Sequence, residues 1–465
     1  MKRLKTELNA LVNRGVDRHL RLAVTGLSRS GKTAFITALV NQLLNIHTGA
    51  RLPLLSAARE ERLLGVKRVP QQDFGIPRFT YDEGLAQLYG QPPMWPTPTR
   101  GVSEIRLALR YRSNDSLLRH FKDTSTLYLE IVDYPGEWLL DLPMLAQDYL
   151  SWSRQMTGLL QGQRAEWSAR WRQLCAGLDP LAPADEARLA DIAAAWTDYL
   201  HACKREGLHF IQPGRFVLPG EMAGAPALQF FPWPDVDAVG EAKLAQADKH
   251  SNAGMLRERY KYYCERVVKG FYKEHFLRFD RQIVLVDCLQ PLNSGPQAFN
   301  DMRLALTQLM QSFHYGQRTL FRRLFSPVID KLLFAATKAD HVTIDQHSNM
   351  VSLLQQLIQD AWQNAAFEGI SMDCLGLASI QATQSGLIEV NGEKIPALRG
   401  NRLSDGQPLT IYPGEVPARL PGQAFWQQQG FQFENFRPQV MDVDRPLPHI
   451  RLDAALEFLI GDKLR

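Results

Sequence analysis

Eight residues near the start of the chain have the types and the order that bind the phosphates of a nucleotide. The segment from Gly26 to Thr33, GLSRSGKT, fits the pattern G-x-x-x-x-G-K-[S/T] at every fixed position. Glycines allow the positive-φ turns that aim successive backbone N–H groups at an anion. Lys32 supplies a positive charge to the β- and γ-phosphates, and the Thr33 hydroxyl is an oxygen ligand for Mg²⁺. The expected nucleotide-binding residues of this loop are Gly26, Ser28, Arg29, Ser30, Gly31, Lys32, Thr33 and Ala34.

A second group follows the apolar run LYLEIV, where Asp133 and Gly136 form D-x-x-G. The pattern alone carries no weight, since it occurs by chance in most chains of this length. Its position gives it meaning, because an aspartate at the end of a buried strand can hold a Mg²⁺-bound water. We therefore expect Asp133 to contact the metal through water and the N–H of Gly136 to sense a γ-phosphate.

A third group, Thr337-Lys338-Ala339-Asp340, follows the apolar run KLLFAA and fits [N/T]-K-x-D. A carboxylate at Asp340 can accept hydrogen bonds from N1–H and from the exocyclic amine of guanine, a pair of donors that adenine lacks. The stem of Lys338 can cover one face of the base. Each of the three groups follows a strand-like run, and open α/β sheets bind ligands at the carboxyl ends of their strands. Together they predict a GTP site.

Other candidate residues lie beside these groups. A switch threonine should precede the second strand, and the loop Trp95-Pro-Thr97-Pro-Thr99 offers two, of which Thr99 is favoured because it is nearer the strand. Thr99 would then be a ligand of Mg²⁺ together with Thr33, and would act in catalysis. The remaining expected nucleotide-binding residues are Trp95, Thr97, His341 and, in a loop after the last strand, Ala382 within Gln381-Ala382-Thr383.

Two charged residues are candidates for hydrolysis. Glu137 follows Gly136, where a water-orienting glutamine is common, and an anion near the γ-phosphate is unfavourable unless it is screened. The sequence therefore predicts slow intrinsic hydrolysis. Arg29 lies within the phosphate loop and could supply a charge in cis, although a solvent-facing Arg29 without a role stays equally open.

The elements that must hold these residues follow from the hydrophobic pattern. The runs at 19–25, 282–289, 331–337 and 374–379 are short and apolar, and helical patterns separate them. Strands that alternate with helices predict an α/β fold with a parallel sheet. The runs at 102–111 and 126–132 predict a hairpin. Residues 46–98 are rich in Gly and Pro and predict a long loop or lid.

The composition is that of a globular protein with a sizeable core, at 45% apolar and 22% charged residues. The net charge of +4 is too weak to indicate a nucleic-acid partner, so none is expected. Five scattered cysteines predict neither a disulfide framework nor a metal site. No signal peptide or membrane span is found, which predicts a cytoplasmic protein.

The chain also resembles a known family. Its core resembles a Ras-like GTPase domain, and its whole length, including LNALVNRGVDRHLRLAVTGLSRSGKTAFIT and LYLEIVDYPGEWLLDLPM, resembles the YcjX-like family of bacterial stress-associated P-loop proteins. The resemblance implies a Ras-like sheet with a large helical insertion and a small C-terminal β appendage. It also implies a role in envelope stress and an inner-membrane protein as partner.

The expected domains follow from these patterns. In chain order they are an N-terminal amphipathic helix (1–15), the first part of a GTPase core (16–136), a helical insertion (137–280), the second part of the core (281–383), a small β appendage (384–448) and a C-terminal helix (449–465).

Three functions stay open. The leading one is a GTPase switch that binds GTP or GDP with Mg²⁺ and contacts a partner protein through its helical insertion. The second is a membrane-associated interaction module that binds nucleotide for structural order, which Glu137 and the basic helix 1–15 favour. That helix could make peripheral contact with an anionic inner membrane, although packing against the protein's own body is the commoner arrangement. The third is an ATPase or a kinase, which the motif from Thr337 to Asp340 and the absence of a recognisable phosphoacceptor site disfavour.

Overall fold

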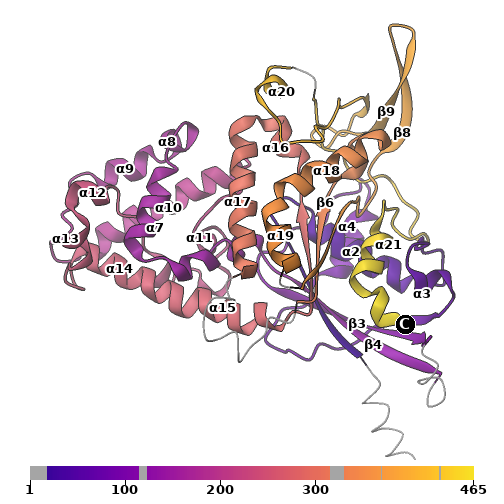
Figure 1. The fold of residues 1–465 in the computed structure, drawn as a ribbon, viewed down its shortest axis with the longest axis horizontal. Coiled ribbons are helices and arrows are strands. Elements are labelled where there is room, and N and C mark those ends of the chain that lie inside the picture. The colour runs from indigo at the N-terminus through magenta and orange to yellow at the C-terminus, as the bar shows by residue number, and fades with distance from the viewer. Residues whose placement is uncertain (1–17, 115–122, 315–328, 368, 429–430) are drawn as a thin grey trace, which may run out of the picture. The chain divides into compact units, whose positions relative to one another are not determined.

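The structure, a computed structural model, describes residues 18–114, 123–314, 329–367, 369–428 and 431–465 (Figure 1). The helix predicted for 1–15 lies outside these residues. The chain forms two compact units. The first comprises Met1–Tyr134, Phe279–Pro296 and Val328–Arg465, and the second comprises Pro135–Arg278 and Gln297–Pro327. The domain boundaries drawn from the sequence stay a prediction.

A seven-stranded, largely parallel sheet forms the centre of the first unit. The strand order is β2-β3-β4-β1-β5-β6-β7. The pairs from β4 to β7 along this order are parallel, and the pairs β2–β3 and β3–β4 are antiparallel. The predicted α/β fold class is confirmed. The strands are β1 Arg18–Gly26, β2 Leu63–Arg68, β3 Ser103–Arg112, β4 Thr124–Asp133, β5 Arg281–Val286, β6 Lys331–Ala336 and β7 Ser371–Gly376.

Helices complete the first unit around this sheet. They are α2 Lys32–Leu44, α3 Ser56–Arg59, α4 Tyr81–Leu88, α16 Leu289–Ser294, α18 His347–Leu357, α19 Gln359–Phe367, α20 Gln423–Gln427 and α21 Leu452–Ile460, with 3₁₀ turns η7 Ala339–His341, η8 Ile344–Gln346 and η9 Gly461–Leu464. Central strands are apolar on both faces because a parallel sheet is covered on both sides. One face of β1 joins α2 and α21 in a single buried cluster that includes Leu22, Phe35 and Leu456.

The C-terminal end of the chain is anchored at the amino end of a central strand of this sheet. The guanidinium of Arg281, at the start of β5, is fully buried and is paired with Asp330 and Asp462. It also donates to the carbonyl oxygen of Leu459 at 2.6 Å. Because a buried cation must be paired, these contacts bind the last residues to the start of the central strand.

Residues 46–98 differ from the sequence expectation of a long loop. They contain the edge strand β2 and the helices α3 and α4. The strand was missed because LLGVKR is short, holds a glycine and ends in two charged residues, which are features of an edge strand rather than of a buried one.

A small antiparallel sheet with the order β10-β9-β8 follows the main sheet in the chain. Its strands are β8 Gln384–Val390, β9 Glu393–Asn401 and β10 Pro408–Ile411. The β8–β9 hairpin turns at Asn391 and Gly392, which both have positive φ, and it extends away from the main sheet (Figure 1). The sequence NG is the preferred one for such a two-residue turn. The predicted C-terminal β appendage is present.

The second unit is helical. Its elements are α6 Gly136–Leu139, η1 Leu142–Ala146, α7 Tyr149–Gly158, α8 Gln163–Trp167, α9 Ala169–Cys175, α10 Glu186–Arg205, α11 Gly214–Val217, η2 Gly220–Met222, η3 Pro226–Leu228, α12 Val236–Val239, α13 Glu241–Ala245, α14 Asn252–Tyr262, a π-helical turn η4 Tyr263–Val268, α15 Lys269–Glu274, η5 Phe276–Arg278 and most of α17 Pro296–His314. Trp152, Trp171 and Trp196 are buried, as the sequence predicted, and Trp167 is half-buried.

Two further expectations concern the whole chain. All five cysteines are free and buried, as expected for a chain without disulfides. No helix among the described residues is long and apolar enough to cross a membrane.

Candidate nucleotide-binding site

The phosphate loop joins the end of β1 to the start of α2. β1 ends at Gly26, and α2 begins at Lys32. Gly31 has φ 87°, and Arg29 has φ 63°, so both lie in the left-handed region. These turns are the ones that point backbone N–H groups to the inside of a phosphate-binding loop. The predicted strand–loop–helix arrangement is therefore present.

The inside of the loop has no room for a side chain at its first position. A Cβ added to Gly26 would lie 2.4 Å from the carbonyl oxygen of Leu285 and 2.4 Å from Ser30 Oγ. Ser30 is 1% exposed, and its hydroxyl has no hydrogen-bond partner within the described part of the chain. A buried hydroxyl without a partner costs stability, so a ligand oxygen at this loop would satisfy it. The Thr33 side chain is also buried.

Of the two candidate switch threonines, the structure brings Thr99 to the site. Its hydroxyl donates a hydrogen bond to Oδ2 of Asp133, a fully buried carboxylate at the end of β4. Thr97 instead pairs with Gln87 on α4. The Thr97 N–H donates to Gln87 Oε1 at 2.9 Å, and Gln87 Nε2 donates to Thr97 Oγ1 at 2.8 Å.

The residues proposed for Mg²⁺ form an all-oxygen set. Thr33 and Thr99 offer hydroxyls and Asp133 offers a carboxylate, which are hard ligands of the kind that Mg²⁺ prefers. Among the described residues, no three His, Cys, Asp or Glu side chains form a metal cluster. This donor set therefore fits a metal that the nucleotide phosphates help to hold, and not a metal held by the protein alone.

Gly136 and Glu137 belong to the second unit, at the start of α6. The Glu137 side chain is 5% exposed, and its Oε1 lies 2.9 Å from Nζ of Lys204 on α10. A Cβ added to Gly214 would lie 2.2 Å from the Glu137 carbonyl oxygen, so α11 packs directly on this residue. The carboxylate of Glu137 is therefore held by the helical unit itself.

The guanine-type motif follows β6. Lys338 has φ 62°, and this left-handed turn leads into the 3₁₀ turn η7, which begins at Ala339. The Asp340 carboxylate is buried and has a partner on each oxygen. Oδ1 lies 2.9 Å from Nδ1 of His341, and Oδ2 accepts the N–H of Ala382 at 2.7 Å. The loop with Ala382 thus contacts the motif, and its role beside a base stays a prediction.

Sequence reasoning missed Asp287, which directly follows β5. Its Oδ2 lies 2.6 Å from Nζ of Lys338, and its Oδ1 accepts the N–H groups of Leu289 and Gln290 at 3.0 and 3.1 Å. Burial raises the pKa of Asp287, but the charge of Lys338 and these hydrogen bonds outweigh it and hold the pKa below its usual range. An aspartate after an apolar strand, the signal used for Asp133, was the available clue.

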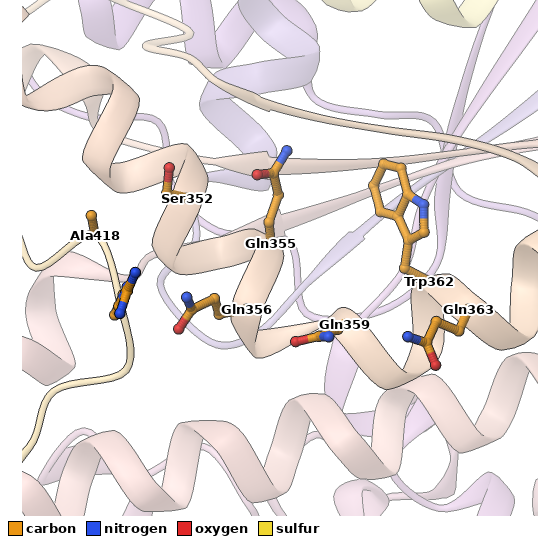
Figure 2. Close-up of a pocket in the computed structure, with 8 residues that line it drawn as sticks. Ser352, Gln355, Gln356, Gln359, Trp362, Gln363 and Ala418 are labelled. Carbon is orange, nitrogen blue, oxygen red and sulfur yellow. The ribbon is translucent and has the colours of Figure 1, made fainter.

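A separate surface hollow of about 570 Å³ lies beside α18 and α19. Figure 2 shows the glutamine side chains that line it, together with Trp362 and Ala418. The lining residues are Ser352, Gln355, Gln356, Gln359, Trp362, Gln363, Ala418 and Arg419. None of them is a carboxylate, a histidine or a cysteine, so the hollow offers no acid–base chemistry and no metal ligands of those types.

The chain matches one family of known proteins and two named relatives. A model of the YcjX-like family, DUF463, matches residues 20–464. The chain is 91% identical over 465 residues to a protein of Escherichia coli (strain K12) named "Ras-like GTPase YcjX", and all of both chains is covered. It is 46% identical over 478 aligned positions to a protein of Shewanella oneidensis with the same name, with 100% of this chain and 98% of that protein covered.

Proposed function

Because the chain belongs to the YcjX-like family, we propose that it binds GTP with Mg²⁺ and hydrolyses it to GDP and phosphate. One observation carries the proposal. The phosphate loop, Asp133 and Asp340 follow the carboxyl ends of β1, β4 and β6, which lie in one sheet with β5 between β1 and β6. This is the edge of an open α/β sheet where ligands bind. The name of the two relatives, "Ras-like GTPase YcjX", supports the same reaction.

The choice of guanine rests on the buried carboxylate of Asp340. Each of its oxygens accepts one hydrogen bond within the fold and keeps a second lone pair. Guanine offers N1–H and an exocyclic amine to such a carboxylate. Adenine would place an acceptor against it, which leaves a buried charge without its partner and costs a few kcal/mol.

The steps of hydrolysis are assigned to this chain's own residues. Backbone N–H groups of the loop from Gly26 to Thr33 bind the phosphates, and Lys32 supplies a positive charge there. Thr99 and Asp133 orient the metal side of the site. Bound Mg²⁺ would neutralise charge on the β- and γ-phosphate oxygens. Arg29 adds charge at the transferring phosphoryl group.

We further propose that the nucleotide acts as a switch in a bacterial envelope-stress response. The support for the stress role is the family resemblance alone. The support for a switch is that the hydroxyl of Thr99, in a Pro-rich loop, donates a hydrogen bond to Asp133 on the side of the site proposed for the metal. Such a segment can be ordered by a γ-phosphate and released by its loss.

A second function, nucleotide binding with little turnover, is favoured by the ion pair between Glu137 and Lys204. In this pair the carboxylate is turned to its own helical unit and is not free to orient a water. Single-turnover hydrolysis of GTP, with and without anionic liposomes, separates the two. If the hydrolysis rate under both conditions is close to that of free GTP in buffer without protein, the second function, nucleotide binding with little turnover, is supported.

Binding itself is tested by calorimetry on the full chain. Lys32→Ala should lower GTP–Mg²⁺ affinity at least tenfold, and Lys67→Ala, which removes an exposed lysine of β2, should leave it unchanged. Wild type should prefer GTP over ATP by roughly a hundredfold. Asp340→Asn should lose GTP and gain XTP, because its amide donates to the C2 carbonyl of xanthine, while Asp345→Asn should behave as wild type. Equal affinity for GTP and ATP would contradict the assignment.

A further inference from the structure

His341, the residue after Asp340, has a partner on each ring nitrogen. Nδ1 lies 2.9 Å from Asp340 Oδ1, and the backbone N–H of Phe436 points to Nε2 at 3.4 Å. An amide N–H can only donate, so Nε2 accepts and the ring hydrogen is on Nδ1, which donates it to Asp340. The side chains of His341 and Asp340 are 5% and 2% exposed. Because both nitrogens have partners in the fold, His341 has no donor or acceptor to offer a base directly.

The segment 433–436, which we call the C-terminal brace, holds the imidazole on its other sides. The Phe433 ring stacks on it with centroids 5.5 Å apart and an angle of 27°, and the Phe436 ring packs edge-on at 5.2 Å. Two hydrogen bonds hold the brace itself in place. Asn293 Oδ1 accepts the Phe433 N–H at 3.1 Å, and the Phe436 carbonyl oxygen accepts Trp95 Nε1–H at 2.8 Å.

The Asp340 carboxylate needs more than one hydrogen bond to hold its plane in one orientation. Rotation of a carboxylate about its last torsion is broad and roughly two-fold, so one hydrogen bond does not fix its plane. Here Ala382 N–H fixes Oδ2, and His341 Nδ1–H fixes Oδ1. Burial raises the pKa of Asp340, but the hydrogen bonds from His341 Nδ1–H and from the N–H of Ala382 outweigh it and hold the pKa below its usual range.

We propose that His341, held by the C-terminal brace, is the positioning residue that sets the plane of the Asp340 carboxylate and thereby the preference for guanine. This inference rests on the proposed function. It places part of the base specificity in residues 433–436, about a hundred positions beyond the motif that reads the base. It also links the base-reading carboxylate, through Phe436, to Trp95 in the loop that leads to Thr99.

Two substitutions of one residue test the proposal. His341→Asn keeps an N–H at the position of Nδ1, so it can still donate to Asp340, although it cannot reach Phe436. His341→Gln places its amide at the position of Nε2, so it can still accept from Phe436 but loses the donor to Asp340. Affinities of the full chain for non-hydrolysable GTP and ATP analogues with Mg²⁺ are measured by calorimetry. His47→Asn and His47→Gln, at an exposed histidine bonded to the Leu64 carbonyl, are the controls.

The GTP-to-ATP affinity ratio should stay within about threefold of wild type in His341→Asn and in both controls. In His341→Gln it should fall at least tenfold, with ATP affinity unchanged. A wild-type ratio in His341→Gln, or an equal loss in His341→Asn, would overturn the positioning role while leaving GTP binding in place. A wild type without any preference for GTP would overturn the proposed function, and this inference with it.

Two variants of Asn293 test the proposal with less disturbance of the core, if the variants of the buried His341 do not fold. Asn293 is exposed, and Asn293→Ala removes the acceptor for Phe433, whereas Asn293→Asp keeps one. We expect Asn293→Ala to lower the GTP-to-ATP ratio about threefold and Asn293→Asp to restore it. Equal ratios in wild type and both variants would show that the brace does not act on the base site.

Discussion

The hydroxyl of Thr99 donates a hydrogen bond to the carboxylate of Asp133, so a loop residue contacts the end of a buried strand where we propose that the metal binds. Thr97, two positions earlier, pairs with Gln87 on α4 instead. Neighbouring threonines of one Pro-rich loop therefore have different surroundings, and this gives a matched pair for experiment.

We expect Thr99→Ala to abolish the ordering of residues 90–101 by a GTP analogue, and Thr97→Ala to leave it intact. Thr99 is bonded to Asp133, the carboxylate proposed for the metal, whereas Thr97 is bonded to Gln87, so only the loss of Thr99 should remove a contact to the γ-phosphate and its metal. Hydrogen exchange of this segment with GDP and with a GTP analogue measures the effect. Equal protection by the two nucleotides in wild type would show that the segment is not a switch.

The ion pair between Lys338 and Asp287 should couple the base site to β5. Removing Lys338 leaves the buried Asp287 carboxylate without its cation, which costs about 3–5 kcal/mol of stability in comparable pairs. Removing Asp287 should cost less, because the Lys338 side chain is 23% exposed and also donates to Asn435. We expect Asp287→Asn and Lys338→Met each to destabilise the protein and the double variant to recover much of the loss. Urea unfolding of the four proteins gives the coupling energy. Additive losses would indicate that the pair is not formed.

Arg29 should matter more for hydrolysis than Glu137. We expect Arg29→Asn to lower the single-turnover rate about tenfold, short of a full arginine finger. Asparagine is chosen because it tolerates the left-handed φ of this position. Glu137→Gln should leave the rate unchanged or raise it, since the Glu137 carboxylate is paired with Lys204. Arg100→Asn, at an exposed position, is the control, and an unchanged rate in Arg29→Asn would point to a group supplied by a partner.

The helical unit should lose stability as the pH rises from 5 to 7. Burial raises the pKa of Asp141 to about 7, against the lowering effect of Tyr263, the Gly214 N–H and Arg215. The folded state therefore binds a proton that the unfolded chain, with a pKa near 3.9, has lost. The loss between pH 5 and 7 is roughly 2 kcal/mol.

Urea unfolding followed by tryptophan fluorescence checks this, since six of the nine tryptophans lie in residues 135–278. Asp141→Asn cannot ionise and should show a flatter profile over the same range. A wild-type profile that rises towards pH 7 would mean that Asp141 is ionised in the folded protein.

The sequence predicted the parts of the site that are local. The phosphate loop, Asp133 and Asp340 each follow a strand by a fixed spacing, and spacing is visible without a structure. The contacts between His341 and Phe436, or Lys338 and Asp287, join residues 95 and 51 positions apart. Nothing in the local pattern of a brace residue such as Phe433 distinguishes it from a core phenylalanine. β2 was missed for the same reason, because an edge strand is defined by the neighbour it pairs with.

The anchoring of the last residues to Arg281 has a consequence for synthesis of the chain. The phosphate loop leaves the ribosome early, but its strand β1 pairs with β5 near Arg281, and the core around β1 is completed by α21. At about 5–20 residues per second, roughly 20–90 s separate the emergence of Thr33 from that of Ile460. During this interval the nascent chain carries an intact phosphate motif without the base-reading half of its site. A nucleotide bound at the proposed site would therefore stabilise the finished protein and would not guide the folding of its first strands.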